Sequence, residues 1–284
     1  MPSSGQRRRT CLLAAGLAIP LLTCTVFRAH AGWEAGAKAG YESNLSRSID
    51  DGEGSGYVTA YAGYVKAHSG ESRLDWTMGL TFQGSVYPSL TDLNSLSAIF
   101  SPGLMYIFHP GWSAAVTPFV QGEVVQDTDQ SAVSFGARVD FSQKFEGGLY
   151  LGEYYVYTDS RANNDVYSYV ENAAGAYLGM RWGKGVFAEV GYEFGWGDSF
   201  LSVKVPVASG GGGQGNGRGT PQYSQAFDAQ VFKENVDFRT VPVTVGFDWS
   251  KRWFSLLNYT YRSWAGDSGT ATDHSGYAGI GYRF

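Results

Sequence analysis

Cysteine is nearly absent from this sequence of 284 residues, and the two that occur, Cys11 and Cys24, lie close to its start. Residues 1–31 read as a secretory signal peptide, because a basic start is followed by an apolar stretch and by Ala29-His30-Ala31. Leu22-Thr23-Cys24 offers a lipoprotein cleavage site as the alternative. Cleavage after Ala31 would leave a chain without cysteine, which excludes disulfides, thiol nucleophiles and thiolate metal sites.

Basic residues are also in short supply. The sequence has 21 Lys and Arg residues against 26 Asp and Glu residues, and the signal peptide contains four of the arginines and no acidic residue. Its removal would change the formal net charge from −5 to −9. Because nucleic acids are polyanions, we expect no nucleic-acid partner.

Long apolar runs are missing after residue 31. A membrane helix needs about 18 or more apolar residues in succession, and residues 32–284 contain no such run, which excludes a helical membrane protein. Prolines are few, at 9, whereas glycine, at 39 residues, and aromatic residues, at 15%, are abundant. This composition is typical of β-strands rather than of long helices.

Alternation with a period of two is the pattern that the sequence does have. Between residues 74 and 86, every even position except that of Gly84 is a large apolar residue, and the odd positions are polar or glycine. Each such segment predicts a strand with one apolar face and one polar face. The pattern predicts twelve strands, near residues 33–43, 57–67, 72–86, 95–108, 112–125, 131–145, 149–159, 167–182, 186–197, 236–249, 253–264 and 274–284.

The connections between these strands alternate in length. Five are tight turns, whereas the six between them are longer and polar, among them residues 44–56 and the Gly-rich span 198–235. Outer-membrane barrels have short turns at one rim, long loops at the other and both termini on the periplasmic side. We therefore predict an all-β fold, with residues 32–284 forming a single antiparallel transmembrane β-barrel of about twelve strands, periplasmic termini and long extracellular loops.

Aromatic residues gather near both kinds of connection, as in the two belts that lie at the lipid interfaces of such barrels. The tryptophans predicted to form these belts are Trp33, Trp112, Trp182, Trp196, Trp249, Trp253 and Trp264. A soluble β-sandwich or lipocalin-like barrel is the alternative, since its strands also alternate. The belts and the signal peptide favour the membrane barrel.

The sequence ends on an alternating strand in which Ile280, Tyr282 and Phe284 share one parity. This ending resembles the terminal strand of barrels that are inserted by the outer-membrane barrel-assembly machinery. The resemblance implies that machinery as a partner, together with outer-membrane lipid and lipopolysaccharide.

The charged residues of the polar parity are expected to point into the barrel, because a basic residue on the lipid face costs about 2–4 kcal/mol near the midplane. The predicted lumen residues are Lys38, Arg73, Asp75, Glu123, Arg138, Asp140, Glu171, Arg181, Glu189, Glu193 and Arg262. They fit two functions. The one favoured is a narrow channel for passive passage of small polar or charged solutes; the other is a closed barrel with a structural, adhesive or envelope-complex role.

Enzymatic chemistry has little support in the sequence. After residue 31 the histidines are His68, His109 and His274, and they form no metal-ligand cluster. Outer-membrane lipid hydrolases use a Ser and a His on the lipid-facing side, whereas the adjacent His274 and Ser275 would point to opposite faces. The Gly-rich stretch at residues 209–220 lacks the Gly-Lys-Ser/Thr of phosphate loops. We expect no cofactor.

Residues 40–47 read Gly-Tyr-Glu-Ser-Asn-Leu-Ser-Arg. This segment is similar to the Gly-Tyr-x-Ser-Asn-x-x-Arg stretch that ends the first strand of several outer-membrane families, among them the barrel domains of surface-lipoprotein assembly modifiers. The similarity covers eight residues. We expect no secretion role, because the sequence shows no helical repeat like the one that precedes the barrel in those modifiers.

Overall fold

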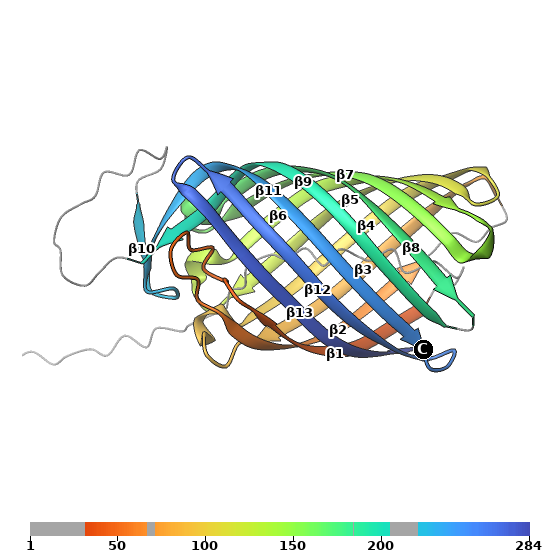
Figure 1. The fold of residues 1–284 in the computed structure, drawn as a ribbon, viewed down its shortest axis with the longest axis horizontal. Helices are drawn as coiled ribbons and strands as arrows, with labels where there is room; N and C mark the ends of the chain where they lie inside the picture. The colour runs from red at the N-terminus through yellow and green to blue at the C-terminus, as the bar shows by residue number, and fades with distance from the viewer. Residues whose placement is uncertain (1–31, 67–71, 184, 205–220) are drawn as a thin grey trace, which may run out of the picture.

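The computed structural model describes residues 32–66, 72–183, 185–204 and 221–284. The predicted signal peptide, the predicted turn at residues 68–70 and the Gly-rich stretch at residues 209–220 lie outside the described residues. The described residues form one antiparallel sheet that closes into a barrel (Figure 1). This confirms the prediction of an all-β antiparallel barrel.

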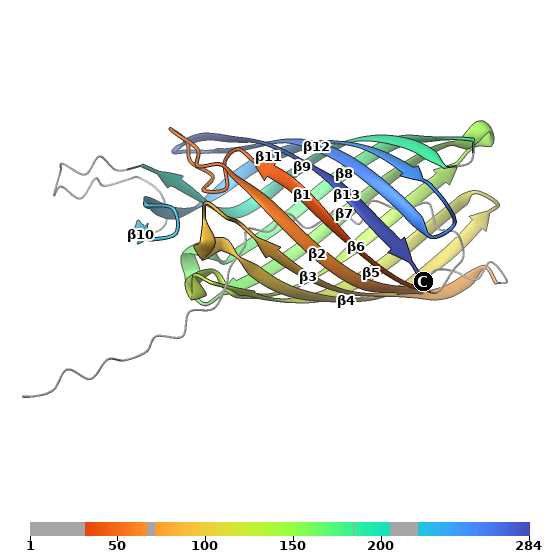
Figure 2. The ribbon, with the colours of Figure 1, turned by 90° about the horizontal axis from the view of Figure 1, so that it is seen from below.

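The strands are β1 (Gly32–Glu42), β2 (Ser55–Lys66), β3 (Leu74–Val86), β4 (Ser95–His109), β5 (Trp112–Val125), β6 (Ala132–Lys144), β7 (Leu149–Ala162), β8 (Tyr169–Trp182), β9 (Val186–Val203), β10 (Gln222–Ser224), β11 (Ala229–Asp248), β12 (Trp253–Gly266) and β13 (Gly269–Arg283). Twelve of them form the wall, in which β13 pairs with β1 and β9 pairs with β11. β10 pairs with β11 at the long-loop end, outside the wall (Figure 2).

Four short 3-10 helices lie in the connections: η1 (Thr91–Leu93), η2 (Thr128–Gln130), η3 (Glu146–Gly148) and η4 (Asp165–Tyr167). No helix among the described residues is long and apolar enough to cross a membrane. Because Glu34 lies opposite Arg283, the first and last strands are neighbours and both begin or end at the short-turn rim. In outer-membrane barrels this rim is periplasmic.

The two faces of the wall differ as the alternation predicted. On β3, the side chains of Leu74, Trp76 and Phe82 are 59%, 51% and 46% exposed on the outside of the barrel. The apolar rows of the other wall strands face outwards in the same way, whereas the inside carries buried polar residues. An apolar outer surface fits hydrocarbon and not water, so the chain is a membrane-spanning barrel of the outer-membrane type. The soluble alternative, with the apolar rows in a core, is wrong.

The structure corrects two of the predicted connections. The loop predicted at residues 198–235 is shorter than expected at both ends. β9 continues to Val203 and β11 begins at Ala229, and Gln230 lies opposite Val203. The long connection expected before residue 274 is a tight turn, with Gly266 paired with Gly269. Alternation is weak in both places because these residues lie beyond the lipid, where the two faces no longer meet different solvents.

Six of the seven predicted interface tryptophans are exposed on the outer surface, at 40–67%. Trp264 is an exception, since it is 4% exposed and belongs to a buried cluster with Leu201 and Phe238. Its placement in the belt was wrong because it shares the inward parity of Arg262, two residues earlier on β12. Nearness to a connection was therefore less informative than parity.

Candidate functional site: the lumen and its long-loop mouth

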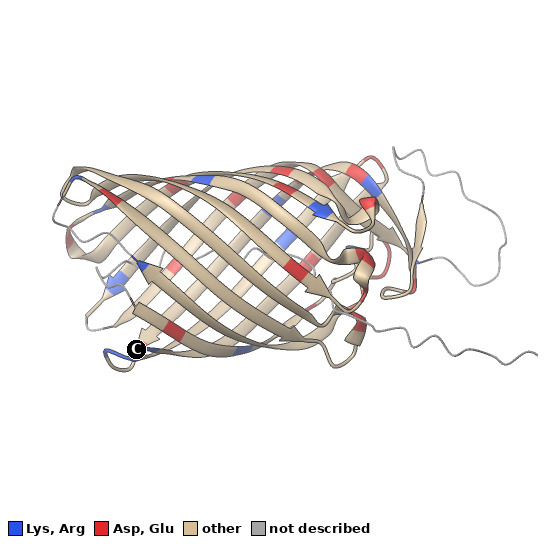
Figure 3. Ribbon diagram, turned by 180° about the vertical axis from the view of Figure 1, so that it is seen from behind, with Lys and Arg blue, Asp and Glu red and all other residues tan. Residues whose placement is uncertain are grey.

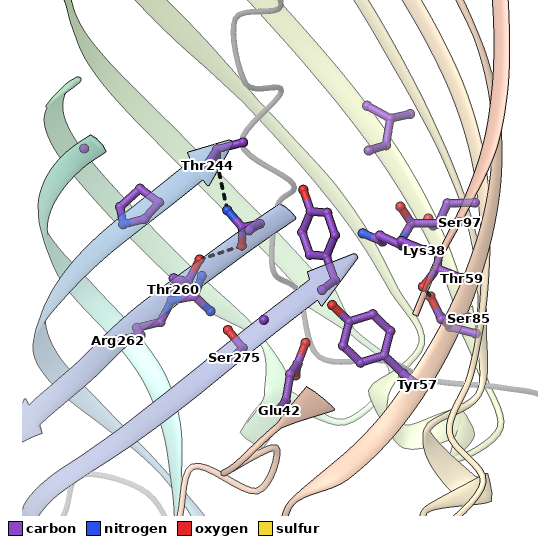
Figure 4. A pocket seen from close by; sticks show the side chains of 18 of the residues that line it. Lys38, Glu42, Tyr57, Thr59, Ser85, Ser97, Thr244, Thr260, Arg262 and Ser275 are labelled. Carbon is purple, nitrogen blue, oxygen red and sulfur yellow. Dashed lines mark hydrogen bonds between the residues drawn. The ribbon is translucent and has the colours of Figure 1, made fainter. Parts of the chain in front are cut away.

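A cavity of about 120 Å³ lies inside the barrel. Its lining side chains come from every wall strand except β6, so the cavity is the lumen itself (Figure 4). Hydroxyl and amide groups make up much of its wall. Thr59 and Ser85 are hydrogen-bonded across β2 and β3 at 2.9 Å, and Asn258 donates to Thr244 at 3.0 Å. A wall with so many polar groups suits a water-filled space.

Glycine makes room for tyrosine on one side of this wall. A Cβ atom at Gly175 would lie 2.5 Å from the ring of Tyr154, and one at Gly179 would lie 2.1 Å from the ring of Tyr150. The missing side chains on β8 therefore let the tyrosines of β7 lie flat against the neighbouring strand. This explains part of the high glycine content that the sequence shows on the polar parity.

The predicted lumen residues fall into three groups. Lys38, Glu123, Glu189 and Arg262 line the cavity, and the structure adds Glu42 to them. Another group has the inward parity elsewhere on the wall: Asp75, Arg138, Asp140, Glu171, Arg181 and Glu193. Arg73 lies directly before the start of β3 and is exposed, so its place in the lumen wall stays a prediction. Figure 3 shows how charged residues are distributed over the barrel.

Two ion-pair groups hold most of the basic residues near the short-turn half of the lumen. Arg138 pairs with Asp140 at 2.7 Å, and its guanidinium carbon lies 4.0 Å from the centre of the Tyr154 ring. Asp248 accepts from both Arg181, at 3.4 Å, and Arg283, at 2.8 Å.

The glutamates of β9 and β5 have neutral hydrogen-bond donors instead. The Tyr150 hydroxyl donates to Glu189 at 3.1 Å, and the Tyr154 hydroxyl donates to Glu193 at 2.8 Å. Glu123, which is 8% exposed, accepts from the Gln121 amide at 3.4 Å.

At the long-loop end, the connection between β1 and β2 is anchored to β13 by a buried carboxylate. Oδ1 of Asp273 accepts from the Ser43 backbone N–H at 2.9 Å, the Ser43 hydroxyl at 3.1 Å and the Asn44 backbone N–H at 3.1 Å. The Asn44 amide in turn donates to the carbonyls of Ser48 and Thr272. The Gly-Tyr-x-Ser-Asn-x-x-Arg segment therefore begins a loop that is hydrogen-bonded to β13, which we name loop 1 (residues 43–54).

Loop 1 presents Arg47 to the extended ends of β9 and β11. The Ser202 backbone N–H donates to the Arg47 carbonyl at 3.1 Å, and the Arg47 side chain donates to the Ser199 hydroxyl. The guanidinium carbon lies 4.6 Å from the Phe200 ring centre and 4.9 Å from that of Trp264. Burial lowers the pKa of Arg47, and the charge of Glu171 opposes this effect. Sequence reasoning missed this residue because it lies on a loop, outside the alternating pattern.

An apolar cluster covers the long-loop mouth. The cover consists of Leu45, Tyr57, Tyr87, Leu93, Val166, Tyr167, Phe200, Ala226, Phe227, Ala229 and Val231. These residues come from loop 1, from β2, from the connection after β3, from η4, from β9 and from residues 226–231 at the start of β11. The connection after β3 lies opposite β9 and β11 in the barrel order. Phe227, at 2% exposed, stacks on Phe200 with a 5.9 Å distance between ring centres. The described residues of β9 and β11 therefore pack against residues from the other side of the mouth.

Neither a nucleophile nor a metal site stands out among the described residues. The His274 ring is hydrogen-bonded to the Tyr259 hydroxyl at 2.8 Å, whereas the Ser43 hydroxyl accepts from the His274 backbone N–H and not from its ring. No group of three or more His, Cys, Asp or Glu side chains in the described part of the chain is placed to hold a metal ion.

Comparison with solved structures shows that outer-membrane β-barrels have a similar fold. An outer-membrane channel from Pseudomonas putida F1 superposes with a TM-score of 0.56 at 9% identity, covering 90% of this chain and 96% of the channel. NanC porin gives 0.51 at 9% identity over 88% and 100% of the two chains, and KdgM porin in complex with oligogalacturonate gives 0.50 at 9% identity over 88% and 99%. No protein-family pattern and no curated protein matches the sequence. The likeness is one of fold: a porin-like barrel.

Proposed function

We propose that this barrel is a passive channel for small polar or charged solutes. The observation that carries the proposal is the cavity inside the barrel, which is lined by polar side chains from eleven of the twelve wall strands. Ionisable groups are too costly to bury without water or partners, and several of those in the wall have no ionic partner within 4.0 Å among the described residues. Water in the lumen would hydrate these ionisable groups. The channel folds of the similar structures support the same function.

The cover implies that the channel is gated. In the conformation described above, the hairpin of β9 and β11 and loop 1 meet across the mouth, so passage requires that the hairpin moves. Planar-bilayer recording of the purified protein tests the proposal. We expect discrete conductance steps separated by long closed intervals. A protein that stays silent, even after the contacts of the cover are removed by substitution, would contradict it.

The cover also favours a second candidate function. A barrel that stays closed would serve as a structural, adhesive or envelope-complex component through its long loops, and a silent bilayer would favour this role. We propose no enzymatic role in either case, because the Ser43 and His274 side chains are not joined as a catalytic pair.

Two further proposals concern partners. The outer aromatic side chains, of which Trp249 at 67% exposed is an example, would contact outer-membrane lipid and lipopolysaccharide. The last residue, Phe284, is 76% exposed, and its ring lies against Tyr282 with centres 5.0 Å apart. An exposed terminal aromatic pair of this kind supports recognition of the last strand by the barrel-assembly machinery.

A further inference from the structure

The charges of the lumen wall are unequal in number. We count the wall residues that have inward parity, are buried or half-buried, and lie outside the part of β9 and β11 beyond Asp198. They include ten acidic and five basic side chains. The acidic residues are Glu34, Glu42, Asp75, Glu123, Asp140, Glu171, Glu189, Glu193, Asp248 and Asp273, and the basic residues are Lys38, Arg138, Arg181, Arg262 and Arg283. Arg47 adds one more basic group at the mouth. Lys66 of β2 pairs with Asp75 at 3.5 Å, and Arg73 and Lys144 share the inward parity but are exposed at the short-turn rim, so the excess of negative charge is confined to the buried middle of the wall.

The basic side chains of the wall have more ionic and aromatic partners than the acidic side chains have. Three of them are neutralised in the ion pairs of Asp140 and Asp248. The other two lie over aromatic rings: the Lys38 ammonium is 5.1 Å from the Tyr277 ring centre, and the Arg262 guanidinium carbon is 5.5 Å from that of Trp264. An aromatic face is an attractive site for a cation, so these groups are held against the wall and not presented to the centre of the lumen.

The carboxylates are presented differently. Glu42, Glu123, Glu189 and Glu193 form no ion pair within 4.0 Å among the described residues. Glu189 and Glu193 lie four residues apart on β9, so they form a vertical row on one wall of the lumen. Their donors are the hydroxyls of Tyr150 and Tyr154, and a hydrogen bond to the charged form of a carboxylate stabilises that form.

We infer that the lumen selects cations over anions, and that its solutes are small inorganic or amine-bearing cations. The inference rests on the proposed channel function and names the class of solute. Rows of carboxylates in a low-dielectric wall raise the local concentration of cations and exclude anions.

The reversal potential in a KCl gradient across a planar bilayer measures this selectivity. For the wild-type protein we expect K⁺ to be at least about threefold more permeant than Cl⁻. In the double variant Glu189→Gln/Glu193→Gln the ratio should fall towards one, because the row loses its charge and keeps its shape. Glu153→Gln is the matched control: it removes a carboxylate of the outer face and should leave the ratio unchanged.

Two different failures are distinguishable. A conducting protein that prefers Cl⁻, or a double variant with the wild-type ratio, would overturn the cation inference and leave the channel function intact. A correctly folded protein that never conducts would overturn the channel function, and the inference with it. Heat-dependent gel mobility, which separates folded from unfolded barrels, shows that each variant is folded before it is recorded.

Discussion

Individual carboxylates in this barrel have opposite effects on stability, depending on which side of the wall they occupy. Asp273 is 4% exposed on the inner side and accepts three hydrogen bonds from loop 1. Glu153 lies on the outer side of β7, where its contact is the Gln143 amide at 3.4 Å. The same functional group therefore stabilises the fold in one place and opposes membrane burial in the other.

Replacing Asp273 by Ala should lower the free energy of unfolding by about 1–3 kcal/mol, because the Asn44 backbone N–H loses its acceptor and the Ser43 backbone N–H keeps only the His274 carbonyl. Urea unfolding in lipid vesicles, followed by tryptophan fluorescence, measures the change. Asp159→Ala, which removes an ion pair with Arg161 on the outer side, should have a much smaller effect. Equal effects of the two substitutions would contradict the role of Asp273 as the anchor of loop 1.

Replacing Glu153 by Leu should raise the free energy of unfolding by about 1 kcal/mol, because a charged group on the lipid face is costly. The same unfolding experiment gives the value, and Glu146→Leu in the exposed turn η3 is the control. A loss of stability in the Glu153 variant would mean that this carboxylate has a favourable partner on the outer surface.

For single residues, the sequence predicted the side of the wall correctly where the parity of the strand decides it. It placed Lys38, Glu123, Glu189 and Arg262 on the wall of the lumen. It failed for Trp264, which was assigned by its nearness to a connection. Arg47 and the acceptor role of Asp273 could not be predicted, because both depend on contacts between residues far apart in the sequence.

At the scale of the elements, the hairpin of β9 and β11 has two different environments along its length. Its lower part is wall, with Glu189 opposite Thr244 and Glu193 opposite Thr240. Its upper part, from Asp198 onwards, leaves the membrane and is buried on both faces, with Leu201 and Ser202 both at 0% exposed. Strand boundaries were predictable where lipid and lumen impose alternation, and they were lost where the hairpin crosses the mouth.

Under the proposed gating, the contacts of the cover hold the mouth closed. Replacing Phe200 and Phe227 together by Ala removes a stacked pair and its buried apolar surface, which should weaken the closed state by more than about 1.4 kcal/mol. We therefore expect the time spent in the conducting state to increase at least about tenfold in bilayer recordings.

Phe247→Ala is the matched control for the cover, since this ring is 45% exposed on the outer face and does not belong to the cluster. It should leave the conducting time unchanged. If the variant of the cover conducted no more often than the control, the hairpin would not be the gate.

At the scale of the whole molecule, the number of strands, the closure and the membrane-facing surface all follow from one local pattern. A period of two decides which residues face outwards, and the outward rows are apolar around the barrel. The state of the mouth does not follow from that pattern. It depends on contacts between loop 1, η4 and the hairpin, which are far apart in the sequence.

The central claim is that neighbouring residues of each strand meet different solvents, lipid outside and water inside. Cysteine reactivity tests it directly, in a chain freed of Cys11 and Cys24. A water-soluble thiol reagent should modify cysteines placed at Asn258 and Thr260, on the inner side of β12, and should leave those at Leu257 and Tyr259 unmodified. Equal reactivity at all four positions, or the reverse alternation, would contradict the account.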